Sequence, residues 1–186
     1  MRWAPFVNDI AARSMTVGRG LIENDHVQLT KQDLLRVFTD PPEPSTFCVD
    51  HLVPDIALAE HAEALDRIMA WARATEGTKG WLLRLLAVRY LLAQRPMGNF
   101  GAKTITRQVE DGDWDEVNPH YLKDCAERMA GQHPYEVMTE QAARINRGVF
   151  SNGRQHTCTQ GDVLDFVKSL KGVDVAFFDA PYGGTL

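Results

Sequence analysis

The sequence predicts an α/β fold in which a parallel sheet is interrupted by a long helical insertion. The first indication is the apolar run Val173–Phe178, whose β-branched and aromatic residues are typical of a strand buried on both faces of a parallel sheet. The second is a strand–helix–strand pattern over residues 156–178. The third is a short apolar strand at residues 4–7. We therefore expect strands from both ends of the chain to share one sheet.

At the amino-terminal end, Asn8 and Asp9 follow the expected strand and precede a helical pattern that starts at Ala11. A carboxylate that closes a strand of a nucleotide-binding sheet commonly accepts hydrogen bonds from both ribose hydroxyls. Asp9 is therefore a candidate ribose ligand. It is also suited to cap the helix that follows, and the two roles are compatible.

The middle of the chain is predicted to be helical. Thr30 is placed to cap a helix over residues 31–38, and residues 40–44 form a proline-rich break. Pro54 opens a long helical pattern, and the strongly apolar pattern at residues 81–92 is expected to lie in the core. Two further helical patterns follow Pro119 and Pro134, over residues 121–130 and 135–147.

A second short strand is expected at residues 156–160, and it ends at Gly161 and Asp162. From Val163 to Leu170, apolar side chains recur three and four positions apart, which predicts a helix with Asp162 as its N-cap. Lys171-Gly172 then ends this helix. The second strand thus ends in a carboxylate one strand away from the apolar run.

The apolar run breaks into Asp179-Ala180-Pro181-Tyr182, so a carboxylate, a rigid turn and an aromatic ring follow a central strand. In open α/β sheets, ligands bind at that end of the strands. Asp179 and the carbonyl of Ala180 can accept hydrogen bonds from an exocyclic amine, while Tyr182 can stack on a flat ring. These residues indicate a site for adenine or cytosine; an ordinary strand-to-loop turn is the alternative.

These four residues resemble the DPPY motif of amino-directed DNA methyltransferases, and DAPYGGT resembles the DPPY-x-GT form of Dam-like adenine methyltransferases. Ala180 departs from the family's first proline; the family uses the backbone carbonyl of that residue, which alanine still supplies. The stretches 8–10 and 161–163 match two cofactor segments in the family's order. The resemblance implies a partial Rossmann-like methyltransferase sheet with a helical insertion.

The resemblance also implies that the chain binds S-adenosylmethionine. Asp162 would contact the adenine of this cofactor, and Asp9 would contact its ribose. Asp165 is the alternative to Asp162 for the adenine contact, or it is a plain charge on the helix surface. The neighbours of the two carboxylates complete the expected cofactor-binding set: Asn8, Ile10, Gly161 and Val163.

The same family carries a helical target-recognition insertion. The Gly-rich, basic stretch at residues 94–108 contains GNFG, which resembles a degenerate form of the family's G-x-F-N segment. Asn99 would hydrogen-bond a base, and Phe100 would pack beside the flipped nucleotide. Lys103 and Arg107 would meet phosphate. An ordinary surface loop at residues 94–108 is the alternative.

We expect the chain to be a fragment of a larger enzyme. The family has a Phe-x-Gly-x-Gly loop that approaches the methionine part of the cofactor, and no such loop is found here, since Gly18 and Gly20 fall inside a helical pattern. The chain alone should therefore bind S-adenosylmethionine weakly or not at all, and it should not catalyse methyl transfer. Residues 1–40 and 148–186 would form the partial catalytic domain, and 41–147 the helical insertion.

Composition narrows the function classes. The formal net charge is −5, yet residues 72–108 carry seven basic residues and one acidic residue, which suits local contact with DNA phosphate. The three cysteines are widely separated and lack metal-ligand spacing with histidine, which favours reduced thiols without zinc. Neither a signal peptide nor a membrane-spanning run is predicted. We expect a cytoplasmic monomer.

The function predicted from these observations is methyl transfer from S-adenosylmethionine to the exocyclic amine of adenine in double-stranded DNA. The target base must leave the stack, because its amine is otherwise paired. Two alternatives remain open. One is the same chemistry on another planar amine, in cytosine, RNA or a protein amide. The other is a non-catalytic α/β binding protein whose DAPY turn is structural.

Overall fold

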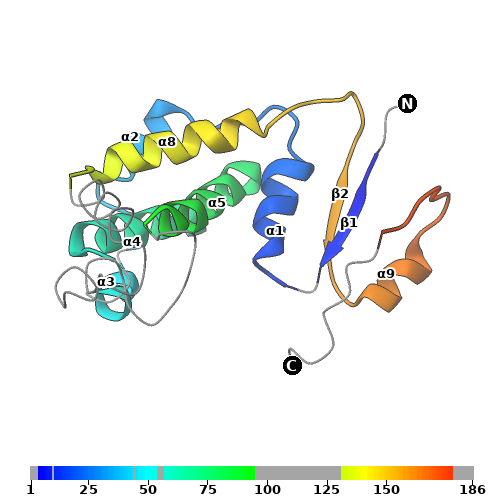
Figure 1. Cartoon of the computed structure of the whole chain (residues 1–186), viewed down its shortest axis with the longest axis horizontal. Helices are drawn as coiled ribbons and strands as arrows, with labels where there is room; N and C mark the ends of the chain where they lie inside the picture. The colour runs from blue at the N-terminus through cyan, green and yellow to red at the C-terminus, as the bar shows by residue number, and fades with distance from the viewer. Residues whose placement is uncertain (1–3, 10, 44, 54–56, 95–130, 178–186) are drawn as a thin grey trace, which may run out of the picture.

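The computed structural model describes residues 4–9, 11–43, 45–53, 57–94 and 131–177. Within these ranges, a group of helices packs beside a two-stranded parallel sheet (Figure 1). The mixed α/β architecture that the sequence predicts is therefore present. The described elements are β1 (Phe6–Asp9), α1 (Ser14–Val17), the π-helix η1 (Gly18–Ile22), α2 (Lys31–Arg36), α3 (Phe47–Leu52), α4 (Ala59–Ala74), α5 (Gly77–Ala93), α8 (Pro134–Arg147), β2 (Thr157–Gln160) and α9 (Val163–Ser169).

The sheet joins the two ends of the described chain. β1 and β2 pair in parallel, with Phe6 opposite Thr157 and Asp9 opposite Gln160. The prediction that strands from both ends share one sheet is confirmed for this pair. Asn8 and Asp9 were expected to follow the first strand, but they lie within it, because their backbone continues the pairing.

The first helix begins later than the sequence indicates. It was expected from Ala11, but α1 starts at Ser14, because the N–H of Ala11 donates to Asp9 Oδ1 at 2.8 Å and forms a local turn first. α1 continues directly into η1, which packs closely on β2. A Cβ atom on Gly18 would lie 1.9 Å from Cys158 Sγ, so only glycine fits there without a shift.

The apolar run predicted as a buried strand is not a strand over its described residues, 173–177, and the prediction is wrong for them. Val175 is 69% exposed and Phe177 is 90% exposed. Apolar composition suits a segment to burial, but burial also needs a neighbouring strand and a covering layer on each face. No strand in the described part of the chain pairs with these residues. Phe178 lies outside the described residues.

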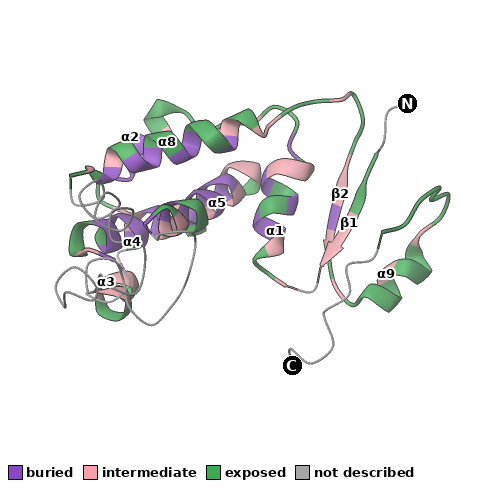
Figure 2. Cartoon of the chain, in the orientation of Figure 1, coloured by how far each residue is buried: buried purple, intermediate pink, exposed green. Residues whose placement is uncertain are grey.

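α9 forms as predicted, with Asp162 as its N-cap, but it does not bury its apolar residues. The carboxylate of Asp162 accepts from the N–H of Leu164 at 2.7 Å and from that of Asp165 at 3.4 Å. No residue of α9 is buried, and Leu164 is 67% exposed (Figure 2). The helix is therefore held mainly by its cap and its own backbone.

The hydrophobic core lies among the helices. α4 packs on α5, and α8 packs on α5 as well, with their buried faces turned toward one another (Figure 2). As the sequence predicts, Thr30 caps α2 and Pro134 opens α8. Inside the core, the hydroxyl of Tyr90 is hydrogen-bonded to His61 Nδ1. The largest fully buried side chains are Tyr90, Met15, Ile68, Leu82, Leu86, Met138, His61 and Val37.

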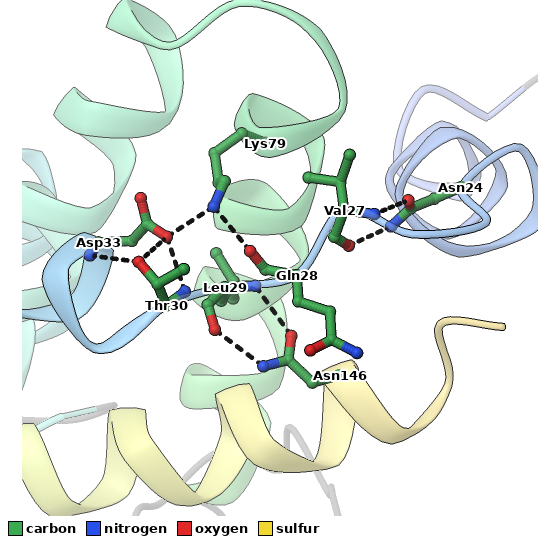
Figure 3. A network of polar contacts seen from close by, with 8 residues as sticks. All are labelled: Asn24, Val27, Gln28, Leu29, Thr30, Asp33, Lys79 and Asn146. Atoms are coloured by element: carbon green, nitrogen blue, oxygen red, sulfur yellow. Dashed lines mark hydrogen bonds and ion pairs between the residues drawn. The ribbon is translucent and has the colours of Figure 1, made fainter.

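Residues 24–30 form a strap that connects η1 to the helical core, and two asparagines hold its backbone (Figure 3). Asn24 Oδ1 accepts from the N–H of Val27 at 2.8 Å, and its Nδ2 donates to the Val27 carbonyl at 2.7 Å. From α8, Asn146 Oδ1 accepts from the N–H of Leu29 at 2.9 Å, and its Nδ2 donates to the Leu29 carbonyl at 2.8 Å. The strap thereby couples the sheet side of the molecule to the core.

Lys79 of α5 provides a third anchor for the strap. Its ammonium group donates to the Gln28 carbonyl and to Asp33 Oδ2, both at 2.6 Å. Burial by itself would raise the pKa of Asp33, but hydrogen bonds from Lys79 and Thr30 hold that pKa below its ordinary value. The stabilisation from this pair is therefore present above the ordinary pKa of an aspartate and is lost as the pH falls through the lowered value.

Replacing Asn146 with alanine should lower the free energy of unfolding by about 1–3 kcal/mol, because both backbone polar groups of Leu29 lose their partners in a largely buried position. Urea unfolding followed by circular dichroism measures this change. Arg147→Ala is the matched control, since Arg147 is the next residue of α8 and is exposed; it should change stability by less than about 0.5 kcal/mol. Equal stabilities for the two variants would show that Asn146 does not anchor the strap.

Candidate functional site

Four of the predicted cofactor-binding residues, Asn8, Asp9, Gly161 and Asp162, lie at the carboxyl edge of the β1–β2 pair. The N–H of Gly161 donates to the Asp9 carbonyl at 3.2 Å, and Asn8 Nδ2 donates to the Gly161 carbonyl at 3.0 Å. Asn8 Oδ1 in turn accepts from the Thr159 hydroxyl at 2.9 Å. These bonds tie the ends of the two strands together, so that Asp9 and Asp162 lie at the same edge of the sheet.

Both carboxylates at this edge are oriented by backbone donors. Asp9 Oδ1 accepts from the N–H of Ala11, and Asp162 Oδ1 accepts from the N–H of Leu164. Asp162 is exposed, and its Oδ2 makes no hydrogen bond within the described ranges. A carboxylate whose one oxygen is fixed by the backbone presents the other in a defined direction, as is needed to accept a ligand N–H or O–H.

Asp165, the alternative to Asp162, has a different environment. It lies on the exposed surface of α9, where its Oδ1 pairs with Lys168 Nζ at 3.3 Å. This is an ordinary helix-surface ion pair between residues three apart. The geometry therefore favours Asp162 over Asp165 as the carboxylate of this edge.

A pocket of about 300 Å³ opens beside the edge, between β1 and the α1–η1 helix. This volume lies at the lower end of the range for small-molecule sites. Its walls are mainly apolar, and Asn8 and Asp9 supply polar groups on the side of the sheet edge. The lining residues are Val7, Asn8, Asp9, Ser14, Val17, Gly18, Ile22 and Cys158.

Cys158 in the pocket wall was not selected from the sequence as a site residue. Burial raises the pKa of its thiol, the nearby Glu23 raises it further, and Arg19 opposes them. The N–H of Cys158 donates to Glu23 Oε1 at 2.6 Å. At neutral pH the thiol is therefore protonated and serves as an apolar wall, not as a nucleophile.

Helices α1 and η1 supply four other pocket residues that sequence reasoning missed: Ser14, Val17, Gly18 and Ile22. The signal available for them was the pair Gly18 and Gly20 inside a helical pattern, since glycine in a helix often marks a close packing contact. Gly18 does make such a contact, against Cys158. Ser14 and Ile22 carried no comparable signal.

Several predicted site residues lie outside the described residues, and their roles stay predictions. They are Ile10, the expected DNA contacts Asn99, Phe100, Lys103 and Arg107, and the turn Asp179, Ala180, Pro181 and Tyr182. Val163 is described as the first residue of α9, where it is 46% exposed. The structure thus brings together Asn8, Asp9, Gly161 and Asp162.

No group of three or more metal-ligating side chains occurs among the described residues. No helix within the described ranges has the length and apolar character needed to cross a membrane. Comparisons with known proteins found no matching family model, no matching curated protein and no matching solved structure.

Proposed function

We propose that the chain forms part of an S-adenosylmethionine-dependent methyltransferase that modifies the exocyclic amine of adenine in double-stranded DNA. The observation that carries this proposal is the position of Asp9 and Asp162 at the carboxyl edge of two adjacent parallel strands, beside a pocket of about 300 Å³. Parallel sheets bind nucleotides at that edge. The order of the motifs along the chain supports the choice of reaction.

In this proposal the two carboxylates hold the nucleoside part of the cofactor. Asp9 accepts from the ribose hydroxyls, and Asp162 accepts from the exocyclic amine of the cofactor's adenine through its exposed carboxylate. The apolar wall of Val7, Val17 and Cys158 offers a surface against which a flat heterocycle packs. The cofactor supplies the activated methyl group when bound.

The target base is assigned to the turn after the apolar run. Asp179 and the carbonyl of Ala180 would accept hydrogen bonds from the amine of the flipped adenine, and Tyr182 would stack on its face. The two acceptors draw electron density toward the nitrogen and align it with the methyl group. Proximity and alignment would then supply most of the acceleration, without a covalent enzyme intermediate.

The domain assignment belongs to the same proposal. Residues 1–40 and 148–186 would build a Rossmann-like catalytic unit, of which β1, β2 and α9 are described members. Residues 41–147 would form the helical insertion that carries the DNA contacts. The protein would act as a monomer, since one flipped base is presented to one site.

The test is to identify the methylated product. DNA from cells that overexpress an active form of the protein would be hydrolysed to nucleosides and analysed by mass spectrometry. The proposal predicts an increase in N6-methyladenine and no increase in methylated cytosine. If cytosine, RNA or a protein amide is methylated instead, the protein is still a methyltransferase, but its acceptor is not adenine in DNA. No methylated product, with the protein folded and supplied with cofactor, would favour the non-catalytic binding protein.

A further inference from the structure

Two arginines from different elements converge on one tryptophan. The Cζ atom of Arg19, in η1, lies 5.1 Å from the ring centroid of Trp81 in α5. The Cζ atom of Arg84, one turn further along α5, lies 4.6 Å from the same centroid. Both guanidinium groups therefore stand within cation–π distance of a single ring, and they are less than about 10 Å apart.

Neither of these arginines is paired with a carboxylate in the described part of the chain. Elsewhere on the surface, Arg67 pairs with Glu63 at 2.8 Å, in the usual i, i+4 arrangement. Arg19 and Arg84 form no ion pair and no hydrogen bond within the described part of the chain. The aromatic ring restrains each guanidinium without neutralising it, so that its N–H donors stay available to an anion.

The position of this pair relates it to the candidate site. Arg19 directly follows Gly18, which lines the pocket together with Asp9. Arg84 lies on α5, whose 17 residues, GTKGWLLRLLAVRYLLA, include three basic residues and no acidic one. The packing of η1 against α5 brings the two cations together at the junction of sheet and helices. Arg19 links this pair of cations to the pocket wall, because its charge opposes the rise in the pKa of the Cys158 thiol.

We propose that Arg19 and Arg84, held by Trp81, form a clamp that binds the sugar–phosphate backbone of duplex DNA. The choice of duplex DNA rests on the proposed function, and the clamp itself rests on the geometry above. A guanidinium matches phosphate oxygens with two parallel hydrogen bonds, and its weak hydration reduces the cost of contact. Along one DNA strand, charges follow every ~3.4 Å of helix axis, so two cations this close reach neighbouring phosphates. On a chain whose formal net charge is −5, the two arginines supply a local positive charge to which a phosphate can bind.

The experiment measures binding of a fluorescein-labelled adenine-containing duplex by fluorescence anisotropy over a series of salt concentrations. The parent should bind at low salt, and its affinity should fall steeply as salt is added. The double variant Arg19→Gln, Arg84→Gln should bind roughly tenfold or more weakly, and the slope of log affinity against log salt should be shallower by about 2, one for each lost phosphate contact. Arg84→Lys should fall between them, because lysine keeps the charge and loses the planar fork.

Arg36→Gln is the matched control. Arg36 stands 4.6 Å from the Trp71 centroid, so this variant also removes one charge and one cation–π contact, but from elements that do not line the pocket. It should keep the parent's affinity and salt slope, and thermal melts should show all variants folded. A double variant that binds like the parent, or an Arg36→Gln variant that loses as much as the double variant, would overturn the clamp. So would a parent that does not bind duplex DNA at low salt.

The outcome is separable from that of the proposed function. Arginine-dependent DNA binding without adenine methylation would keep the clamp and remove the enzyme assignment. Adenine methylation that does not change when the two arginines are replaced would keep the enzyme assignment and overturn the clamp. Tighter arginine-dependent binding of duplex RNA than of duplex DNA would overturn the choice of DNA as the partner.

Discussion

Gly80→Ala is expected to lower the free energy of unfolding by about 3 kcal/mol. Gly80 lies in the first turn of α5, where the backbone passes very close to the end of α4. A Cβ atom there would lie 2.0 Å from the carbonyl oxygen of Thr75 and 3.3 Å from that of Ala72. Both neighbours are backbone atoms, so the clash cannot be relieved by a rotamer change and must shift one helix against the other.

Gly20→Ala serves as the control for this prediction. The nearest atoms to a Cβ on Gly20 are the backbone carbon and oxygen of Trp81, both at 3.6 Å, which is ordinary van der Waals contact. Stability should stay the same or rise by up to about 1 kcal/mol, because alanine narrows the unfolded ensemble. Urea unfolding of the parent and both variants measures these changes in the free energy of unfolding. Equal stability of Gly80→Ala and the parent would show that α4 and α5 do not meet this closely.

In an active form of the protein, Tyr182→Ala should slow methylation far more than it weakens cofactor binding. The Tyr182 ring is proposed to face the target base, whereas the cofactor is assigned to Asp9 and Asp162. Losing one aromatic–base stack costs roughly 1–3 kcal/mol, which is about 5- to 150-fold in rate if it is fully expressed in the transition state. Asp179→Ala should cost more, since it removes an acceptor aimed at the reacting amine.

Single-turnover methylation of adenine-containing duplexes, beside a cofactor titration of each variant, measures both quantities. Tyr182→Phe is the conservative control: it keeps the stacking ring and should stay close to the parent's rate. If Tyr182→Ala methylates as fast as the parent, the DAPY turn does not hold the substrate, and its structural interpretation is preferred.

Local signals in the sequence predicted much of the described fold. The two short strands, the helix capped by Asp162 and the helices opened by Thr30 and Pro134 all lie close to their expected positions. The starts of the three helices depend on interactions within a few residues, such as the side chain of Thr30 accepting from the N–H of Asp33. Caps and periodicity report such contacts directly, so sequence reasoning finds them.

The failures arise where distant segments decide the outcome. Residues 173–177 are apolar enough for a central strand, yet Phe177 is 90% exposed, because composition does not supply the neighbouring strand that would bury it. In the candidate site, too, residues with a local signal were predicted and residues placed by distant packing were missed. Asp9 and Asp162 were found because each closes a strand, whereas Cys158 and Ser14 reach the pocket only through the packing of η1 and α1 against the sheet.

The proposed function requires that the edge formed by β1 and β2 binds the nucleoside part of S-adenosylmethionine. The most direct measurement is the amide chemical shifts of the isotope-labelled chain during titration with S-adenosylhomocysteine, with adenosine and L-methionine as separate ligands. We expect weak binding, with shifts at Asn8, Asp9, Gly161 and Asp162 for S-adenosylhomocysteine and adenosine but not for methionine. In the Asp9→Asn, Asp162→Asn double variant, which keeps the backbone-bound oxygens, these shifts should be lost. Absence of shifts at these amides at millimolar ligand, or unchanged shifts in the double variant, would show that this edge does not bind the nucleoside.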